Sequence, residues 1–201
     1  GARRKAENGP GEISSLPVDP FRRLPPFAGR FSMDRSPDTS LPQTPPLEAR
    51  LVARLAERGW TLALAESCTG GLVAQRVTSV PGASAIFLGG VVAYHNDAKR
   101  DVLGVPAATL DAVGAVSTET ALAMAQGVRR LLHASLAAAI TGIAGPGGGT
   151  DAKPVGLVFV AVSGPRGDQV ERCLFSGDRG TVRAQAAEAA LRLLLGQATG
   201  N

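Results

Sequence analysis

Apolar runs alternate along the chain with segments whose apolar residues recur at helical spacing. The runs are short enough for buried strands and are bounded by glycine, proline or polar residues; they comprise residues 60–65, 89–94 and 136–141. The segments with helical spacing predict amphipathic helices at residues 47–58, 72–77, 118–132 and 181–195. Strands that alternate with helices predict an α/β domain with a mainly parallel sheet.

Two further features complete the predicted elements. Residues 156–163 are rich in valine and phenylalanine, residues 164–168 form a turn, and residues 169–176 return as an antiparallel partner. Asn96 and Ser117 are residue types that cap helices, so each is expected to begin a helix. The expected fold class is a three-layer α/β/α domain with a mixed, mainly parallel sheet and one antiparallel hairpin.

The N-terminal part of the chain has a different composition. Nine of the 14 prolines lie in residues 1–46, among charged residues and Ser or Thr, without a sustained apolar period. This composition predicts a disordered or linker-like N-terminal extension, and residues 47–201 are then the folded domain. Met33 lies inside the extension and is a candidate for the native start of the chain.

Charge and apolar content exclude several classes of protein. The formal net charge of +4 is split evenly between the chain up to Arg50 and the remainder, so neither part predicts a nucleic-acid binder. No run of about 18 apolar residues is present and no signal peptide is evident, which predicts a cytoplasmic protein without a membrane span. Cys68, Cys173, His95 and His133 lack metal-ligand spacing, so no metal is expected.

The turn after the strand at residues 60–65 is the first candidate for chemistry. Ser67 lies where a strand ends and a helix begins, and Thr69, Gly70 and Gly71 follow it. The first N–H groups of a helix have no intrahelical partner, and glycine lets the backbone approach a ligand, so this turn favours binding of an anion or a developing oxyanion. The alternative is that Ser67 and Thr69 only cap the helix.

Other polar residues follow the remaining strands. Ligands of open α/β sheets bind beyond the strand ends, so the informative side chains come directly after each strand; they are those of Ser67, Tyr94, Lys99 and Thr141, with Arg179 and Arg183 at the start of the last helix. A lysine that burial keeps neutral can take the proton of a serine nucleophile, and Tyr94 could relay that proton or orient the amine. Taken singly, each residue is better explained as a solvated or structural side chain.

Five motifs in a fixed order resemble those of one known family. They are AESCTGG at 65–71, YHNDAK at 94–99, GAVS at 114–117, TGIAGPGGGTDAKPVG at 141–156 and FSGDR at 175–179. The chain is similar over about residues 47–196 to the CinA C-terminal domain family, also known as nicotinamide mononucleotide deamidases.

The resemblance implies an activity and roles for residues. The implied reaction is hydrolysis of the carboxamide of nicotinamide mononucleotide to nicotinic acid mononucleotide and ammonia, in pyridine nucleotide recycling. It implies an enzyme without metal or cofactor that forms a homodimer or higher homo-oligomer, with Ser67 as nucleophile assisted by Tyr94 and Lys99.

The substrate contacts expected from this chemistry lie in the same motifs. Backbone N–H groups near Thr69, Gly70 and Gly71 are expected to bind the oxyanion. The other candidate contacts are Thr141, Gly142 and Gly145, with Arg179, Arg183 and the loop 145–149 for the 5′-phosphate.

The chain departs from the family pattern in two respects. His95 stands where the family more often has serine or threonine, and a nucleotide-pyrophosphatase-like domain that accompanies many members does not precede the domain in this sequence. The resemblance therefore implies the stand-alone form.

Three alternatives compete with a serine amidohydrolase. Cys68 is a possible nucleophile, because a thiolate at a helix N-terminus has a lowered pKa. A second alternative is a non-catalytic nucleotide-sensing or interaction module linked to competence or DNA damage. A dinucleotide-binding oxidoreductase is less well supported, because the loop from Gly142 has no G-x-G-x-x-G motif.

Overall fold

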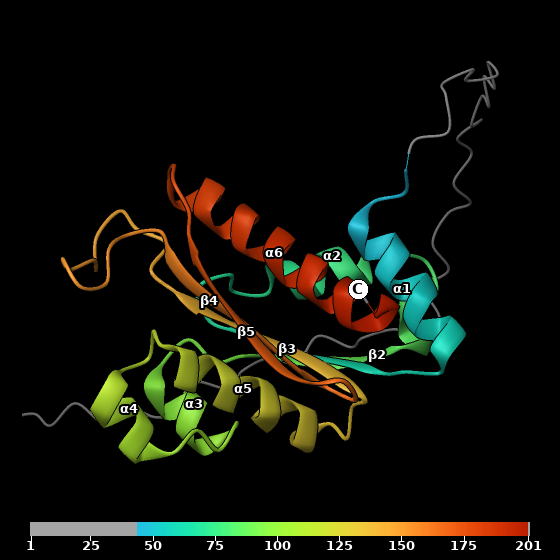
Figure 1. Ribbon diagram of the computed structural model, residues 1–201, viewed down its shortest axis with the longest axis horizontal. Coiled ribbons are helices and arrows are strands. Elements are labelled where there is room, and N and C mark those ends of the chain that lie inside the picture. Colours follow the sequence, from blue (N-terminus) through green and yellow to red (C-terminus); the bar gives the residue numbers. More distant parts are fainter. Residues whose placement is uncertain (1–43, 201) are drawn as a thin grey trace, which may run out of the picture. The chain divides into compact units, whose positions relative to one another are not determined.

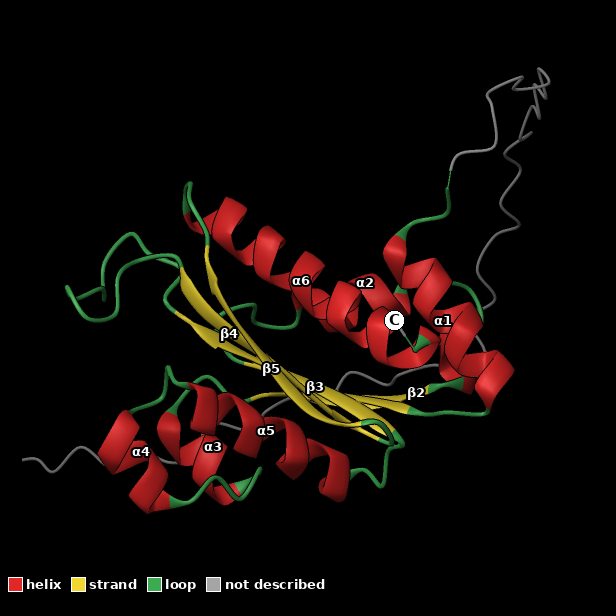
Figure 2. Ribbon diagram, viewed as in Figure 1, coloured by secondary structure: helices red, strands yellow, loops and turns green. Residues whose placement is uncertain are grey.

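The computed structural model describes residues 44–200, which form three layers with a sheet between two layers of helices (Figures 1 and 2). The three-layer α/β/α prediction is confirmed. The predicted extension at residues 1–46 lies outside the described residues except for its last three positions, 44–46.

The sheet has the strand order β2-β1-β3-β4-β5. Its strands are β1 (Leu62–Glu66), β2 (Phe87–Val92), β3 (Leu136–Gly142), β4 (Leu157–Gly164) and β5 (Gly167–Leu174). β1 pairs in parallel with β2 and β3, whereas β4 is antiparallel to both β3 and β5. Four of these five strands therefore share one direction. The predicted hairpin is formed by β4 and β5, which lie at one edge of the sheet.

Each face of the sheet carries its own apolar core. One face is covered by α1 (Leu47–Arg58), α2 (Leu72–Thr78) and α6 (Arg179–Thr199), and a short 3₁₀ turn spans Ala83–Ala85. The other face is covered by α3 (Asn96–Asp101), α4 (Ala107–Val113) and α5 (Thr118–Leu131). No helix in the described part of the chain is both long enough and apolar enough to span a bilayer.

Side-chain alternation along β1 determines which residues face each core. Leu62 and Leu64 pack toward α1 and α6, whereas Ala63 and Ala65 pack toward α5. β3 repeats this division, with alanine on the α5 side, and small side chains let the helix approach the sheet closely. The alternation then directs Glu66 toward the α2 layer and the residue after it, Ser67, toward the α3 layer.

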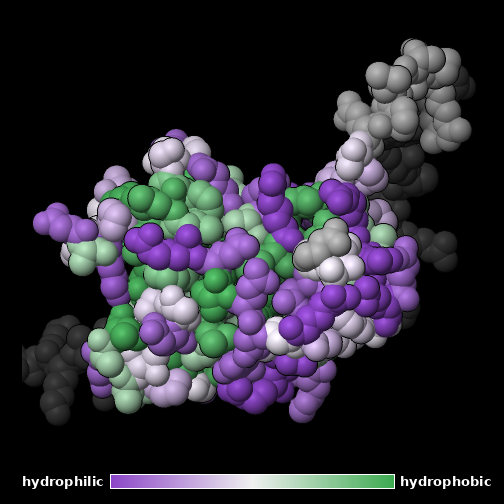
Figure 3. All heavy atoms as spheres, viewed as in Figure 1, coloured by the Kyte–Doolittle hydropathy of each residue, from purple (hydrophilic) through white to green (hydrophobic). Residues whose placement is uncertain are grey.

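The outer surface of α1 is polar. Leu51, Val52 and Leu55 of α1 are buried, while Arg54 and Glu57 form an exposed ion pair at 2.8 Å on its outer side. Figure 3 shows hydrophilic side chains over α1 at the right of the view. This amphipathic division confirms the helix predicted at residues 47–58.

Some element boundaries differ from the prediction. The strand expected at residues 89–94 is Phe87–Val92, so Tyr94 lies beyond its end. Asn96 is the first residue of α3 rather than its cap, because His95 takes that role and its Nδ1 accepts from Asp97 N at 3.3 Å. Ser117 is confirmed as a cap, since its Oγ accepts a hydrogen bond from Thr120 N at 3.1 Å.

Candidate active site

A serine and a buried lysine meet at the carboxyl end of the parallel strands. Lys99 Nζ lies 3.1 Å from Ser67 Oγ, 2.9 Å from Ala93 O and 3.2 Å from Tyr94 O. The lysine side chain is enclosed, with 1% of the residue exposed, and forms no ion pair with a carboxylate among residues 44–200. Burial lowers the pKa of Lys99, which favours the neutral amine that a general base requires.

Local structure explains how these two residues meet. β1 ends at Glu66, and Ser67 N donates to Ile140 O at 2.9 Å, which fixes the start of the turn against β3. The chain leaves β2, is capped by His95, and begins a short helix whose fourth residue is Lys99. The predicted meeting of Ser67 and Lys99 thus depends on the ends of two neighbouring parallel strands.

Tyr94 takes part through its backbone rather than its phenol. Its carbonyl accepts from Lys99 Nζ, while its side chain is 60% exposed and its Oη accepts from Arg179 Nη2 at 2.8 Å. The Arg179 guanidinium also donates from Nη1 to Gly145 O at 2.9 Å. The expectation that the phenol contacts the Lys99 amine is therefore corrected: the phenol is held by Arg179.

A cavity of about 260 Å³ opens beside the serine and lysine. Figure 1 shows the β3–β4 loop and the start of α6 at this end of the sheet. The predicted residues that line the cavity are Ser67, Tyr94, Lys99, Thr141, Gly142, Gly145 and Arg179, together with Gly147 and Gly148 of the predicted loop 145–149 and the alternative nucleophile Cys68. The remaining lining residues are Asn96, Ala115, Val116, Ile143 and Ala144.

Several of these lining residues were not predicted as site residues. Thr141 Oγ1 donates to Ala115 O at 2.7 Å and so holds Ala115 and Val116 against the cavity. Asn96 lies inside the YHNDAK motif, and Ala115 and Val116 lie inside GAVS. The motifs themselves were therefore the available signal for these three residues.

Four predicted contacts do not line this cavity. Gly70 N donates to Ser67 O at 3.1 Å, and Gly71 N donates to Glu66 Oε2 at 2.9 Å. Thr69 is fully buried, and its carbonyl accepts from Arg183 Nη2 at 2.7 Å. The anion site expected at the start of α2 is thus occupied by the carboxylate of Glu66, which had no predicted role.

Cys68 does not have the environment of a reactive thiolate. It is buried, and burial, reinforced by the charge of Glu66, raises the pKa of its thiol to about 11 despite opposing backbone N–H groups and Lys99. The lowered pKa expected at a helix N-terminus is therefore wrong for this residue. The thiol is protonated near neutral pH and has no hydrogen bond to Lys99 among the described residues, whereas Ser67 Oγ lies 3.1 Å from Lys99 Nζ, so the geometry favours Ser67 as the candidate nucleophile.

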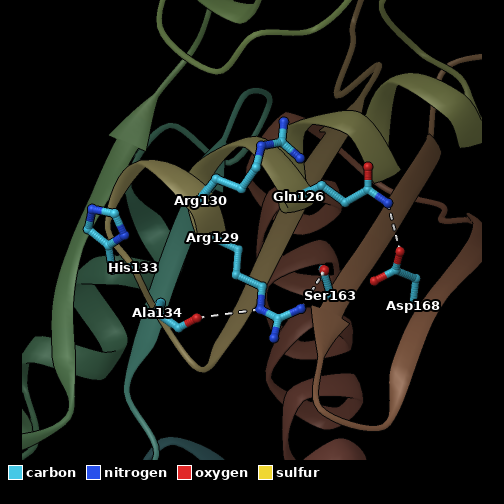
Figure 4. Close-up of a pocket in the computed structure, with 7 residues that line it drawn as sticks. All are labelled: Gln126, Arg129, Arg130, His133, Ala134, Ser163 and Asp168. Atoms are coloured by element: carbon cyan, nitrogen blue, oxygen red, sulfur yellow. Dashed lines mark hydrogen bonds between the residues drawn. The ribbon is translucent and has the colours of Figure 1, made fainter.

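A larger hollow, of about 610 Å³, lies at the other end of the sheet (Figure 4). It is lined by Gln126, Arg129, Arg130, His133, Ala134, Ser163 and Asp168. Figure 4 shows that the guanidinium groups of Arg129 and Arg130 point in different directions, and an arginine beside Ser163 cannot act as its base. The hollow also holds the His133 imidazole, but Figure 4 shows it on the opposite side from Ser163, and no hydrogen bond joins the two side chains, in contrast to the 3.1 Å contact of Ser67 and Lys99 in the smaller cavity.

The described part of the chain contains no candidate metal site. Among residues 44–200, no group of three or more His, Cys, Asp or Glu side chains lies together in a way that could hold a metal ion.

Residues 44–198 match the family model of the CinA C-terminal domain. The chain belongs to this family. A CinA-like protein of Anaeromyxobacter dehalogenans is 58% identical over 144 residues, which cover 72% of this chain and 35% of that relative. The chain spans about a third of the length of the curated relatives that it matches, as the coverages of 34% and 35% show.

Solved structures of the CinA superfamily share the fold. The competence/damage inducible protein CihA of Agrobacterium tumefaciens is 41% identical, with a TM-score of 0.70, over 77% of this chain and 98% of that chain. A competence-damaged protein (CinA) superfamily protein of Klebsiella pneumoniae is 38% identical, with a TM-score of 0.74, over 77% of this chain and 97% of that chain. Both likenesses cover nearly all of the solved chains.

Proposed function

We propose that this CinA-family domain hydrolyses the carboxamide of nicotinamide mononucleotide to nicotinic acid mononucleotide and ammonia, within pyridine nucleotide recycling. The observation that carries the proposal is the buried Lys99 amine 3.1 Å from Ser67 Oγ at the edge of a cavity. Amide hydrolysis requires a nucleophile, a base that later protonates the leaving amine, and donors for the oxyanion.

The hydrogen bonds of Lys99 suit it to act as the base. A neutral amine has two N–H groups and one lone pair, and the carbonyls of Ala93 and Tyr94 can accept both N–H groups. The lone pair is then free to accept the Ser67 hydroxyl proton. Backbone carbonyls thus orient the amine without adding a carboxylate that would hold the proton on it.

The reaction proceeds through an acyl-enzyme. Ser67 Oγ attacks the carboxamide carbon while its proton passes to Lys99, and the tetrahedral intermediate collapses as Lys99 returns that proton to the departing ammonia. Water then attacks the ester while Lys99 accepts one of its protons, and Lys99 returns that proton to Ser67 Oγ as the carboxyl product leaves. No bond change in these steps requires an oxidant, a reductant or a cofactor.

Oxyanion stabilisation is assigned to the loop after β3. Gly147 and Gly148 line the cavity, and their N–H groups have no acceptor among residues 44–200, whereas the N–H groups of Gly70 and Gly71 are paired within the turn. Unpaired backbone donors that line a cavity are suited to a developing negative charge.

Three amides test the function. Purified protein is incubated with nicotinamide mononucleotide, nicotinamide riboside or free nicotinamide, and ammonia release is followed. We expect turnover of the mononucleotide above the other two. Binding of the mononucleotide without turnover would contradict the proposal and favour a nucleotide-sensing module.

Arg179 is the proposed contact for the 5′-phosphate. Arg179→Met should lower kcat/KM for the mononucleotide by about 10- to 100-fold and leave the riboside nearly unchanged, because a charge-assisted hydrogen bond to phosphate is lost. The ratio of the two kcat/KM values is the measurement. Arg183→Met is the matched control, since Arg183 lies one turn further along α6 but bonds Thr69 O outside the cavity. An equal loss with both substrates would contradict the assignment.

A second copy of this chain is proposed as a partner at the β2 edge of the sheet. β2 is an edge strand, FLGGVV, without a charged residue, and Leu88 and Val92 are 47% and 52% exposed. The opposite edge strand, β5, carries Asp168, Glu171 and Arg172, and charge protects an edge from pairing. An unprotected apolar edge favours contact with another copy.

Leu88→Glu tests this interface. It should convert the homodimer to monomer in size-exclusion chromatography with light scattering, because two carboxylates would face an apolar contact. The control is Leu174→Glu, an apolar position on β5 that is more exposed than Leu88, at 61% against 47%, and this variant should leave the mass unchanged. A monomeric wild-type protein, or a dimer that survives Leu88→Glu, would contradict the proposed edge contact.

A further inference from the structure

Glu66 is a buried carboxylate directly before Ser67, and the proposed chemistry does not use it. Only 2% of the residue is exposed. Its Oε2 accepts from Gly71 N at 2.9 Å and from Val73 N at 3.2 Å, and its Oε1 accepts from Ala74 N at 2.8 Å. Both carboxylate oxygens are thus held by the first turn of α2.

This arrangement replaces an ordinary helix cap. The N-cap of α2 is Gly71, which has no side chain to accept a hydrogen bond. The first N–H groups of a helix lack intrahelical partners and carry partial positive charge, so a buried carboxylate is strongly favoured there. Glu66 supplies this carboxylate from the end of β1, across the turn that contains Ser67.

The turn is therefore fixed at both ends. Ser67 N donates a hydrogen bond to Ile140 O of β3, and Gly70 N donates one to Ser67 O. Gly70 and Gly71 have φ values of 60° and 95°, a left-handed backbone that glycine adopts readily. Glu66 thus links β1 to α2 across the turn that carries Ser67, whose Oγ lies 3.1 Å from Lys99 Nζ.

We propose that Glu66 is the positioning residue of the Ser67 nucleophile. Its carboxylate holds the strand-to-helix turn so that the serine hydroxyl faces Lys99, and it occupies the anion site at the start of α2. The inference rests on the proposed function, because it assigns Glu66 to the same site. Glu66 faces the α2 layer and acts on the reaction only through the backbone that carries Ser67.

Glu66→Gln tests the role while preserving side-chain shape. The amide offers one acceptor oxygen, and its NH₂ group would face a backbone N–H, so the clamp should loosen. We expect kcat for the mononucleotide to fall about 10- to 100-fold with KM changed less than about threefold, because small misplacement of a reacting group has effects of this size. Labelling of Ser67 by a fluorophosphonate probe should slow by a similar factor.

Glu48→Gln is the matched control. Glu48 Oε2 accepts from Arg76 Nη2 at 2.6 Å, so this variant removes a carboxylate that also holds α2 but lies outside the turn. It should lower the melting temperature while keeping wild-type kcat and labelling rate. If Glu66→Gln fails to fold, Glu66→Asp keeps the charge but shortens the reach, and it should still show slower labelling.

The outcomes separate this inference from the proposed function. A Glu66→Gln protein that melts at lower temperature but keeps wild-type kcat and labelling rate well below that temperature would overturn the positioning role and leave a purely structural one. Wild-type labelling at Ser67 without turnover of the mononucleotide would overturn the proposed substrate only. A wild type that is neither labelled nor active would overturn both.

Discussion

Replacing Ser67 with alanine is expected to lower kcat for ammonia release by about 10³-fold or more, because the acyl-enzyme can no longer form. The Ser67→Ala protein should keep its fold and its affinity for the mononucleotide, since the hydroxyl contacts only Lys99 among the described side chains. Steady-state ammonia assays give kcat, and mass spectrometry should detect an acyl adduct on the wild type but not on the variant.

Cys68→Ala is the control for the adjacent nucleophile. The thiol is buried and its pKa is raised to about 11, so its removal should change kcat less than about threefold in comparison with the large loss expected at Ser67. Full activity in Ser67→Ala together with loss in Cys68→Ala would transfer the nucleophile to the thiol.

Lys99→Met should lower kcat by about 10²- to 10⁴-fold, the usual range for loss of a general base. Methionine fills a similar volume without a basic nitrogen. Because only the neutral amine accepts the Ser67 proton, wild-type kcat/KM should rise as pH increases through the lowered pKa of Lys99. The residual activity of Lys99→Met should lack that rise. A pH profile with the same rise in both proteins would contradict the role of Lys99 as base.

The same lowered pKa has a consequence for stability. Burial holds the folded-state pKa of Lys99 below its ordinary value of 10.5, so the unfolded chain binds more protons between the two values. The free energy of unfolding of the wild type should therefore increase with pH in that interval relative to Lys99→Met. Urea unfolding of both proteins at about pH 7 and about pH 9 measures the difference. Parallel changes in the two proteins would contradict it.

The sequence predicted most elements because their signals are local. The apolar period of α1 and the cap at Ser117 both depend on residues a few positions apart. The predicted position of β2 was two residues too far along the chain, because FLGGVV has two central glycines and no clear alternation of apolar and polar residues. α3 begins one residue earlier than a cap at Asn96 implies, since a histidine side chain can accept the same hydrogen bond.

The site was predicted in part. Strand-end positions correctly indicated that Ser67 and Lys99 meet, because parallel neighbouring strands bring their carboxyl ends together. The direction of long side chains was not predictable, so Tyr94 was expected at the amine and Arg183 at the cavity. Glu66 was missed because a carboxylate in an apolar run shows its purpose only when the helix that it caps is placed beside it.

Alternation along β1 makes the length of this strand more critical than its exact composition. Glu66 and Ser67 are consecutive, yet one serves the helix layer of α2 and the other faces the amine carried by α3. Replacing Leu62 or Leu64 with another apolar residue alters packing locally. Deleting one residue of β1 would instead turn the Glu66 carboxylate toward the Lys99 amine and the Ser67 hydroxyl toward α2. Insertions and deletions within β1 should therefore abolish activity, whereas conservative apolar substitutions at Leu62 or Leu64 should be tolerated.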